Sequence, residues 1–177
     1  MTTWFTSDEH YHHKNILKFS KRPFSNLQDM HQALIDNNNR VVEDKDVVYH
    51  LGDFSFANPK KTQRIIDQLK GKHVFINGSH DYWARKMNLP YIIEKKIDGN
   101  YIVMCHYAMR TWARSHYNSW NLHGHSHGTL DSDGKQMDVG VDCNEFFPVS
   151  FDMVAQIMNN LPDNFNFVQD KKGPTWK

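Results

Sequence analysis

Residues 74–81 read Val-Phe-Ile-Asn-Gly-Ser-His-Asp, and this stretch decides the fold that we expect. The apolar run 74–76 is typical of a buried strand, and it ends in small residues just before His80 and Asp81. A strand that breaks into a Gly-containing turn presents its next polar side chains at the rim of a sheet. In α/β proteins, sites are built at that rim, outside the carboxyl ends of the strands. The stretch therefore predicts an α/β protein with a site at the end of this strand.

Length and composition fit one domain with a core of its own. The chain has 177 residues and 39% hydrophobic content. We predict a single domain over 1–162 and a polar C-terminal tail over 163–177. The chain has 21 Lys and Arg residues and 20 Asp and Glu residues, so its charge is nearly balanced. No overall electrostatic field would therefore attract it to nucleic acid or to an anionic membrane. Any recognition of phosphate must therefore be local.

The sequence shows no targeting signal that would place the protein outside the cytoplasm. Its two cysteines, Cys105 and Cys143, do not make a disulfide framework, which suits a reducing compartment. The residues after Met1 lack the basic and apolar regions of a secretory signal. No apolar run approaches the roughly 20 residues that a membrane span needs. We therefore expect a cytoplasmic protein without a membrane partner.

Other strand-like runs end in the same way as 74–76, each with His or Asp at its tip. Runs 2–6, 46–51, 101–105 and 119–123 lead to Asp8 and His10, to Asp53, to His106, and to His125 and His127, respectively. Side chains two apart on extended backbone point to the same side, so Asp8 and His10 can converge while Glu9 turns away. This repeated placement of His and Asp is the main argument for function.

Helix and turn signals separate these strands. We predict helices that begin at a capping box over 25–28 and at Asn58-Pro59, the second ending at Gly71, a short helix over 82–87, and a terminal helix after Ser150. The Asp98-Gly99 pair predicts a hairpin between strands 91–97 and 101–105, and 137–142 is the last predicted strand.

The segment 107–118 is basic and aromatic and has no regular periodicity. It is either an irregular surface connection or a loop that faces the substrate, since guanidinium groups pair with phosphate and aromatic rings stack on bases. On the second interpretation, Arg110, Arg114 and His116 are the candidate substrate contacts.

The His and Asp residues at separate strand ends predict a metal site. Mixed imidazole and carboxylate ligands suit Mn, Fe or Zn better than Mg or Ca. They are too many for one tetrahedral zinc, and a structural zinc module usually draws on Cys. Two ions that share a bridging carboxylate fit the number of ligands, and paired ions are used to hold and attack phosphate esters.

The order of these motifs resembles that of the calcineurin-like metallophosphoesterases, in particular the small bacterial and phage type. The matching motifs are D-x-H at 8–10, G-D at 52–53, G-x-H-D at 78–81, His106, HGHSHG at 123–128 and DVGVD at 138–142. The resemblance covers roughly residues 3–152. It implies a two-sheet β-sandwich flanked by helices, an α/β/β/α arrangement, with the site at the carboxyl ends of the strands.

The resemblance also implies roles for individual residues. Asp8, His10 and His127 would bind the first ion, Asp53 would bridge, and His106 and His125 would bind the second ion. A metal-bound hydroxide would attack phosphorus, while His80 protonates the leaving oxygen and Asp81 orients its ring. For the two divalent ions, manganese is the first expectation, with iron or zinc as alternatives.

Ser79 departs from the family pattern, which has Asn at this position of the third motif. The Asn normally gives its amide oxygen to the second ion, whereas a Ser hydroxyl is shorter and a weaker neutral ligand. We therefore expect weakened binding of the second ion and lower turnover than in a Ser79→Asn variant.

Three hypotheses follow. The first is a dinuclear metal-dependent phosphoesterase that prefers phosphodiesters to monoesters and acts on a phosphorylated small molecule or on a nucleotide or nucleic-acid ester. The second is a metal-binding domain that recognises a phosphorylated ligand with little or no turnover, which Ser79 motivates. The third is an α/β domain whose histidines only happen to lie in loops, which the order of the motifs disfavours.

Overall fold

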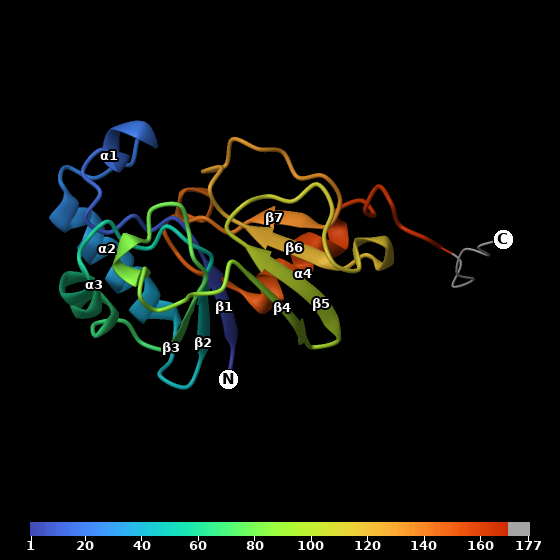
Figure 1. Cartoon of the computed structure of the whole chain (residues 1–177), viewed down its shortest axis with the longest axis horizontal. Coiled ribbons are helices and arrows are strands. Elements are labelled where there is room, and N and C mark those ends of the chain that lie inside the picture. The colour runs from blue at the N-terminus through green and yellow to red at the C-terminus, as the bar shows by residue number, and fades with distance from the viewer. Residues whose placement is uncertain (170–177) are drawn as a thin grey trace.

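The computed structural model describes residues 1–169 and contains two four-stranded sheets (Figure 1). The first sheet has the order β3-β2-β1-β8, with β1 (Thr3–Thr6), β2 (Val47–His50) and β3 (Lys72–Phe75) parallel and β8 (Val149–Ser150) antiparallel to β1. The second has the order β4-β5-β6-β7, with β5 (Asn100–Cys105), β6 (Trp120–His123) and β7 (Gln136–Asp138) parallel and β4 (Ile92–Ile97) antiparallel to β5. The sequence did not predict β8.

In the described part of the chain, four helices accompany the sheets: α1 (Ile16–Phe19), α2 (Leu27–Val41), α3 (Pro59–Ile66) and α4 (Phe151–Asn160). Short 3₁₀ turns occur at Tyr82–Ala84, Ser115–Tyr117 and Val141–Cys143. The predicted cap at Asn58 is confirmed, because its side chain accepts a hydrogen bond from the amide of Lys61 at 2.9 Å. Helix α2 begins one residue later than the capping box indicated, since Asn26 and not Ser25 caps it. Within residues 1–169, no helix combines the length and the apolar character needed to cross a membrane.

Three predicted elements are shorter than expected, and the helix expected over 82–87 is only the 3₁₀ turn Tyr82–Ala84. Helix α3 ends at Ile66, well before Gly71. Strand β7 ends at Asp138, because the chain then leaves its neighbour β6 and forms a bridge between Gly140 and Ser7 of the first sheet. The residues that follow make a helical turn rather than more strand.

The main core lies between the two sheets. It contains Phe5, Tyr49, Leu51 and Ile76 from the first sheet and its loops, Ile102, Met104, Trp120, Leu122 and Met137 from the second sheet, and Val154 and Met158 from α4. A second core, with Met30, Leu34, Ile65, Phe54 and Trp83, joins α2 and α3 to the first sheet. Figure 1 shows these two helices beside that sheet. Each buried side chain of this size contributes about 1.5–3 kcal/mol. The predicted α/β fold with two sheets flanked by helices is confirmed.

The parallel strands place the expected site residues at one end of the molecule. The loops after β1 and β2 are joined by hydrogen bonds, from the amide of Asp8 to the carbonyl of Gly52 and from the amide of His10 to the carbonyl of Asp53, both at 3.0 Å. The loops after β5 and β6 are joined in the same way, because the amide of Gly124 donates to the carbonyl of His106 at 3.0 Å.

The loop 107–118 covers the outer face of the second sheet. Asn121 is paired in register with Val103 and Gln136, so these three side chains share the face opposite the core. Asn121 Oδ1 accepts hydrogen bonds from the amide of Met109 and from Gln136 Nε2, at 3.2 and 2.7 Å. Gln136 Nε2 also donates to the Met109 carbonyl at 2.9 Å. The loop therefore satisfies polar side chains on the outer face of the second sheet.

Residues 163–169 of the expected polar tail pack against this loop. Asn164 is 3% exposed, and its Nδ2 donates to the carbonyls of Ser115 and Ser119 at 2.9 and 3.0 Å. Its Oδ1 accepts a hydrogen bond from the amide of Lys135 at 2.7 Å. The remainder of the expected tail, 170–177, lies outside the described residues.

Candidate metal centre

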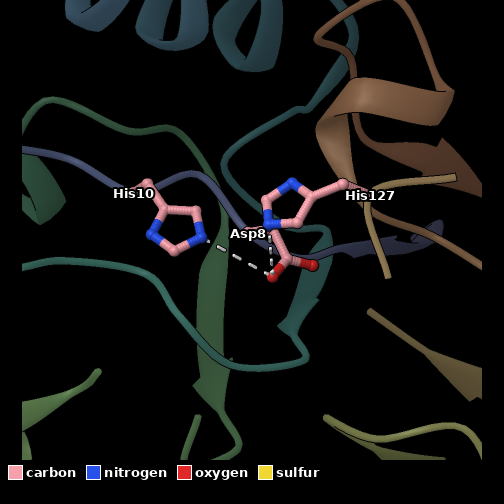
Figure 2. Close-up of side chains that lie close together, drawn as sticks. All are labelled: Asp8, His10 and His127. Carbon is pink, nitrogen blue, oxygen red and sulfur yellow. Dashed lines mark ion pairs between the residues drawn. The ribbon is translucent and has the colours of Figure 1, made fainter. Parts of the chain in front are cut away.

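Asp8, His10 and His127 form a first cluster of possible metal ligands (Figure 2). One ligand atom of each lies within 4.8 Å of those of the other two. Asp8 Oδ1 is 3.8 Å from His10 Nε2 and 3.9 Å from His127 Nε2. Because these atoms face a common point from two distant segments of the chain, they are suited to hold one ion.

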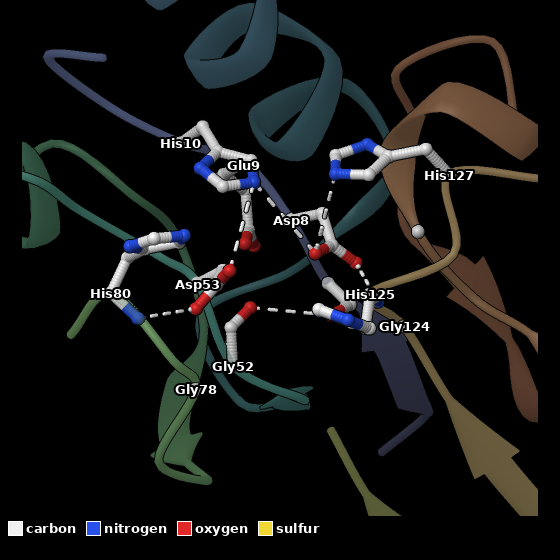
Figure 3. Close-up of polar contacts among 12 residues, drawn as sticks. Asp8, Glu9, His10, Gly52, Asp53, Gly78, His80, Gly124, His125 and His127 are labelled. Carbon is white, nitrogen blue, oxygen red and sulfur yellow. Dashed lines mark hydrogen bonds and ion pairs between the residues drawn. The ribbon is translucent and has the colours of Figure 1, made fainter. Parts of the chain in front are cut away.

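Asp53, His106 and His125 form a second cluster, which also satisfies the 4.8 Å limit. Asp53 Oδ2 is 3.4 Å from His106 Nε2 and 3.8 Å from His10 Nε2 of the first cluster. Asp53 thus contacts a residue of each cluster, where a carboxylate can serve both, and Figure 3 shows it beside His10 and His80.

Unpartnered buried atoms test whether metal ions fit these clusters. Asp8 Oδ1, His10 Nε2 and His106 Nε2 are buried and have no hydrogen-bond partner among residues 1–169. A buried polar group left unsatisfied costs about 1–3 kcal/mol. These atoms are also the ones through which the clusters face inward. A cation in each cluster would satisfy them, so the residues fit the ions that the sequence predicted.

The imidazole rings are oriented by partners outside the clusters. His106 Nδ1 lies 2.9 Å from the carbonyl of Leu51, and His127 Nδ1 lies 2.6 Å from Asp142 Oδ2. These partners occupy one nitrogen of each ring and leave Nε2 to face the cluster, which is how metal-binding histidines are usually held.

Arg22 connects this arrangement to the first cluster. Its Nε and Nη2 donate to the two carboxylate oxygens of Asp142, both at 2.8 Å. Nη2 and Nη1 also donate to the carbonyls of Asp8 and Glu9, at 2.6 and 2.9 Å. The sequence analysis missed Arg22 and assigned no role to Asp142. The available signal was the final position of Asp142 in the DVGVD stretch.

The cluster residues have unusual backbone conformations. Asp8, His10, Asp53, His125 and His127 have φ values of 60°, 54°, 56°, 67° and 46°. Left-handed conformations cost non-glycine residues of order 1–3 kcal/mol each, and they gather at functional sites where the surroundings enforce them.

Two glycines allow the close packing around these carboxylates. A Cβ atom on Gly78 would collide with the amide nitrogen and Oδ1 of Asp53, and one on Gly124 would collide with Ser7 Oγ and Asp8 Oδ2. The small residues in the G-x-H-D and G-H-x-H stretches are therefore required by space.

The surroundings of the clusters shift the pKa values of several of their residues. Burial raises the pKa of Asp8 to about 7, although His106 and His127 oppose the shift. Burial lowers the pKa of His10 to about 2, which keeps its ring neutral. Burial also acts to raise the pKa of Asp53, but the nearby imidazole of His106, whose Nε2 lies 3.4 Å from Asp53 Oδ2, helps to outweigh it, and this pKa is lowered. A neutral imidazole and an ionised carboxylate are the forms that bind metal.

His80 and Ser79 both contact the central carboxylate. The amide of His80 donates to Asp53 Oδ1 at 2.8 Å, and the ring centroid of His80 lies 6.0 Å from that of His10. Ser79 Oγ donates to Asp53 Oδ2 at 3.0 Å. The structure thus places the predicted acid and the substituted position beside both clusters.

Asp81 does not orient the His80 ring, so this expectation was wrong. One Asp81 oxygen accepts hydrogen bonds from the amides of Asp53 and Gly78, at 2.8 and 2.9 Å. The other accepts from the amides of Phe54 and Ser55 and from Trp83 Nε1, at 2.9, 3.2 and 2.9 Å. The carboxylate is 4% exposed and holds the loops after β2 and β3 together.

An open cleft of about 1000 Å³ lies over the clusters. Its floor includes His10, Asp53, His80, His125 and His127. Its walls include Phe19, Phe56, Leu130 and Lys21. Phe19 and Leu130 are 73% and 50% exposed, so large apolar side chains stand in solvent at the mouth. The sequence analysis missed this apolar wall.

Arg114 lies away from the cleft. Its guanidinium carbon is 4.7 Å from the ring centroid of Tyr101, near the amino end of β5. The clusters lie at the other end of this strand, beyond Cys105. A strand rises about 3.3 Å per residue, so Arg114 is separated from the site by most of the length of the sheet.

Arg110 and His116 are also used elsewhere. The Arg110 guanidinium carbon is 5.3 Å from the ring centroid of Phe165, and the carbonyl of His116 accepts a hydrogen bond from the amide of Val168 at 3.0 Å. Neither residue lines the cleft. Of the two interpretations of loop 107–118, the structure favours a surface connection for the part with Arg110, Arg114 and His116, because this part covers the second sheet.

A buried polar chain runs behind the first cluster. Glu9 Oε1 is 2.6 Å from His50 Nδ1, and His50 Nε2 is 2.9 Å from His73 Nδ1. Burial lowers the pKa of His50 to about 3 and that of His73 to about 4. Both rings are therefore neutral in the folded protein at neutral pH.

His73 should make the stability depend on pH. Its folded pKa of about 4 is below the ordinary value of 6.5, so between these values the unfolded chain binds a proton that the folded chain does not. Stability contributed by neutral His73 is thus complete above pH 6.5 and is lost as the pH falls toward 4. As the pH decreases, the free energy of unfolding should fall less steeply in His73→Gln than in the wild type. The two slopes should differ by up to about 1.4 kcal/mol per pH unit.

Urea denaturation of chelator-treated protein across this pH range measures the effect. His116→Gln is the matched control, because it removes an exposed histidine and should follow the wild type. Parallel curves for wild type and His73→Gln would contradict the assignment.

The chain resembles proteins whose functions are not established. An uncharacterised protein of Methanocaldococcus jannaschii is 33% identical over 164 residues, which span 88% of this chain and 90% of that protein. No family model matches the chain.

A solved structure shares the fold, and a second is more distantly similar. A protein of unknown function from Aquifex aeolicus superposes with a TM-score of 0.70 at 22% identity, over 88% of this chain and 98% of that one. A conserved uncharacterised protein of Streptococcus pneumoniae TIGR4, described as a predicted phosphoesterase, has a TM-score of 0.46 at 17% identity, over 78% of this chain and 70% of that one. The chain therefore belongs to the family of the M. jannaschii protein, and it shares the fold of the A. aeolicus protein.

Proposed function

We propose that this protein is a dinuclear metal-dependent phosphoesterase that prefers phosphodiesters. The observation that carries the proposal is the pair of three-ligand clusters that meet at Asp53 on the floor of an open cleft. When bound, two divalent ions, manganese first and iron or zinc as alternatives, would neutralise phosphate oxygens and activate water.

His80 is the proposed general acid. Its backbone is fixed by the hydrogen bond to Asp53. Its ring lines the cleft and lies close to the rings of His13 and Phe56. An imidazole works near neutral pH and can transfer a ring proton to the leaving oxygen of the ester. Asp53 would therefore hold both the ions and the segment that carries the acid.

The walls of the cleft support a phosphodiester substrate. Phe56 stacks on His13 with a centroid distance of 3.8 Å, and Phe19 and Leu130 extend the apolar wall. This wall can receive an organic substituent of the phosphate. Of the residues that the structure describes, Lys21 is the single Lys or Arg that lines the cleft, so it gives little extra attraction for a dianionic monoester. A phosphorylated small molecule, a nucleotide or a nucleic-acid ester has the required groups.

Hydrolysis of bis(p-nitrophenyl) phosphate by chelator-treated protein, with and without added Mn²⁺, tests the proposal. Activity should require the metal and should exceed that toward p-nitrophenyl phosphate. Undiminished hydrolysis after complete removal of metal would overturn it. If both metal and phosphate bind without turnover, a phosphate-recognition domain, which Ser79 favours, becomes the better description.

We expect Ser79→Asn to tighten the second ion and to raise turnover. The second cluster has three ligand residues, and the Ser79 hydroxyl donates to Asp53, whereas an Asn amide oxygen can add a ligand. A gain of about tenfold in affinity corresponds to about 1.4 kcal/mol. Manganese titration and diester hydrolysis measure both effects.

Ser79→Ala is the control for this prediction, since it removes the hydroxyl and adds no ligand. Equal metal affinity and equal turnover in the wild type and Ser79→Asn would show that position 79 does not limit the site.

A further inference from the structure

A second pocket of about 480 Å³ lies beside the metal centre, and Ser79, Tyr82, Arg85, Asn88 and Tyr91 are among its lining residues. The pocket meets the cleft at the third motif. Ser79 lines the pocket and donates its hydroxyl hydrogen bond to Asp53 on the floor of the cleft, while the next residue, His80, lines the cleft. A substrate held at the two clusters can therefore extend into this pocket.

Arg85 supplies the pocket with an available positive charge. Its guanidinium carbon lies 4.3 Å from the ring centroid of Tyr82, and no carboxylate within residues 1–169 forms an ion pair with it. Stacking on an aromatic ring leaves the edge of a guanidinium free, and that edge matches the geometry of phosphate.

The acidic side chain that lines the pocket forms hydrogen bonds elsewhere. Asp81 also lines the pocket, but both of its oxygens are engaged by the backbone amides and Trp83, as described above. Tyr82 and Tyr91 are 53% and 68% exposed at the same pocket. Their rings can cover a sugar or a base next to a bound phosphate.

We propose that this pocket is a second subsite, which binds a second phosphate of the substrate through Arg85. The inference rests on the proposed function, and it narrows the substrate to a nucleotide-type diester that carries a further phosphate. That phosphate has two possible sources, the terminal phosphate of a small nucleotide or the next phosphate of a strand.

Equilibrium binding tests the subsite without turnover. We would compare thymidine 3′,5′-bisphosphate with thymidine 5′-monophosphate by calorimetry in the presence of Mn²⁺. The wild type should bind the bisphosphate about tenfold more tightly, the effect of one charge-assisted contact. Arg85→Gln should lose most of this preference, and Arg85→Lys should keep part of it. Lys86→Gln, which removes an exposed neighbouring charge that does not line the pocket, should retain the full preference.

Two binding outcomes would overturn the inference. One is an equal affinity of the wild type for both compounds. The other is an equal loss in Arg85→Gln and Lys86→Gln, which would indicate a general positive field. If Arg85 governs the preference but no diester is hydrolysed, the subsite stands and the proposed function fails. If hydrolysis depends on Asp53 but the protein shows no preference for the second phosphate, the proposed function stands and the subsite inference fails.

Turnover distinguishes the two sources of phosphate. The substrates are thymidylyl-thymidine, the same dinucleotide with a terminal 5′- or 3′-phosphate, and a longer oligothymidylate. If the terminal phosphate on the dinucleotide already gives the full Arg85-dependent rise in kcat/KM, and the longer chain adds nothing further, the natural source is a small nucleotide. A rise that comes only with the longer chain supports a strand. The absence of any Arg85-dependent rise, in an enzyme that cleaves these diesters, would overturn the inference.

Discussion

Asp53→Asn is expected to abolish phosphodiester hydrolysis and to reduce the metal content from two ions to one. Asp53 Oδ2 faces His106 Nε2 at 3.4 Å and His10 Nε2 at 3.8 Å, so one carboxylate serves both clusters. The amide of Asn keeps the shape but loses the negative charge and one of the two ligand oxygens. If the ions supply most of the stabilisation of the transition state, kcat/KM should fall by about a thousandfold or more, which corresponds to about 4 kcal/mol.

Metal analysis after dialysis against Mn²⁺ and hydrolysis of the activated diester measure the two effects. Asp44→Asn is a matched control, because Asp44 is exposed near the amino end of β2, whereas Asp53 follows the carboxyl end of the same strand. The amide of His80 can still donate to the carbonyl oxygen of Asn at position 53, so the fold should persist, and a thermal melt verifies this. An Asp53→Asn protein with two ions and normal hydrolysis would refute the bridging role.

The placement of the cluster residues could be predicted because it depends on local pattern and on topology. Asp53, His106 and His125 each follow a strand-like run, and the carboxyl ends of parallel strands meet at one edge. The small residues Gly78 and Gly124 marked the turns that allow close approach. The parallel strands of the first sheet and the helices α2 and α3 were also visible from capping residues and apolar spacing, since both signals are local.

The partners of the cluster residues could not be predicted in this way. Arg22 and Asp142 are 120 positions apart, and nothing in either neighbourhood indicates that they meet. Asp81 has the same sequence neighbours whether it orients a ring or holds backbone amides. Arg110 and Arg114 have the charge that phosphate recognition needs, but their position over Phe165 and Tyr101 depends on how the loop packs.

Arg22 is the clearest example of such a partner, and its environment sets the size of the expected effect. Its side chain is fully buried, and it donates to Asp142 as well as to the carbonyls of Asp8 and Glu9. Asp142 in turn orients His127 through the contact with Nδ1. Lysine keeps the positive charge but cannot reproduce the planar, two-pronged contact. Its substitution for Arg22 would leave a buried carboxylate poorly paired and the D-x-H loop without two of its donors.

Arg22→Lys should therefore lower both the stability and the affinity of the first cluster. Breaking a buried ion pair costs about 3–5 kcal/mol, and because lysine retains the charge we expect about 2–3 kcal/mol. Loss of a partner that orients a ligand typically reduces metal affinity by about 10–100-fold. Urea denaturation and competitive Mn²⁺ titration measure the two quantities, and Arg64→Lys, on the exposed face of α3, controls for the exchange of residue type. A variant that loses stability but binds both ions normally would show that Arg22 stabilises the fold and does not position the metal ligands. Weaker metal binding, together with a comparable loss of affinity in Asp142→Asn, would establish that the contact from Arg22 through Asp142 to His127 positions the ligand.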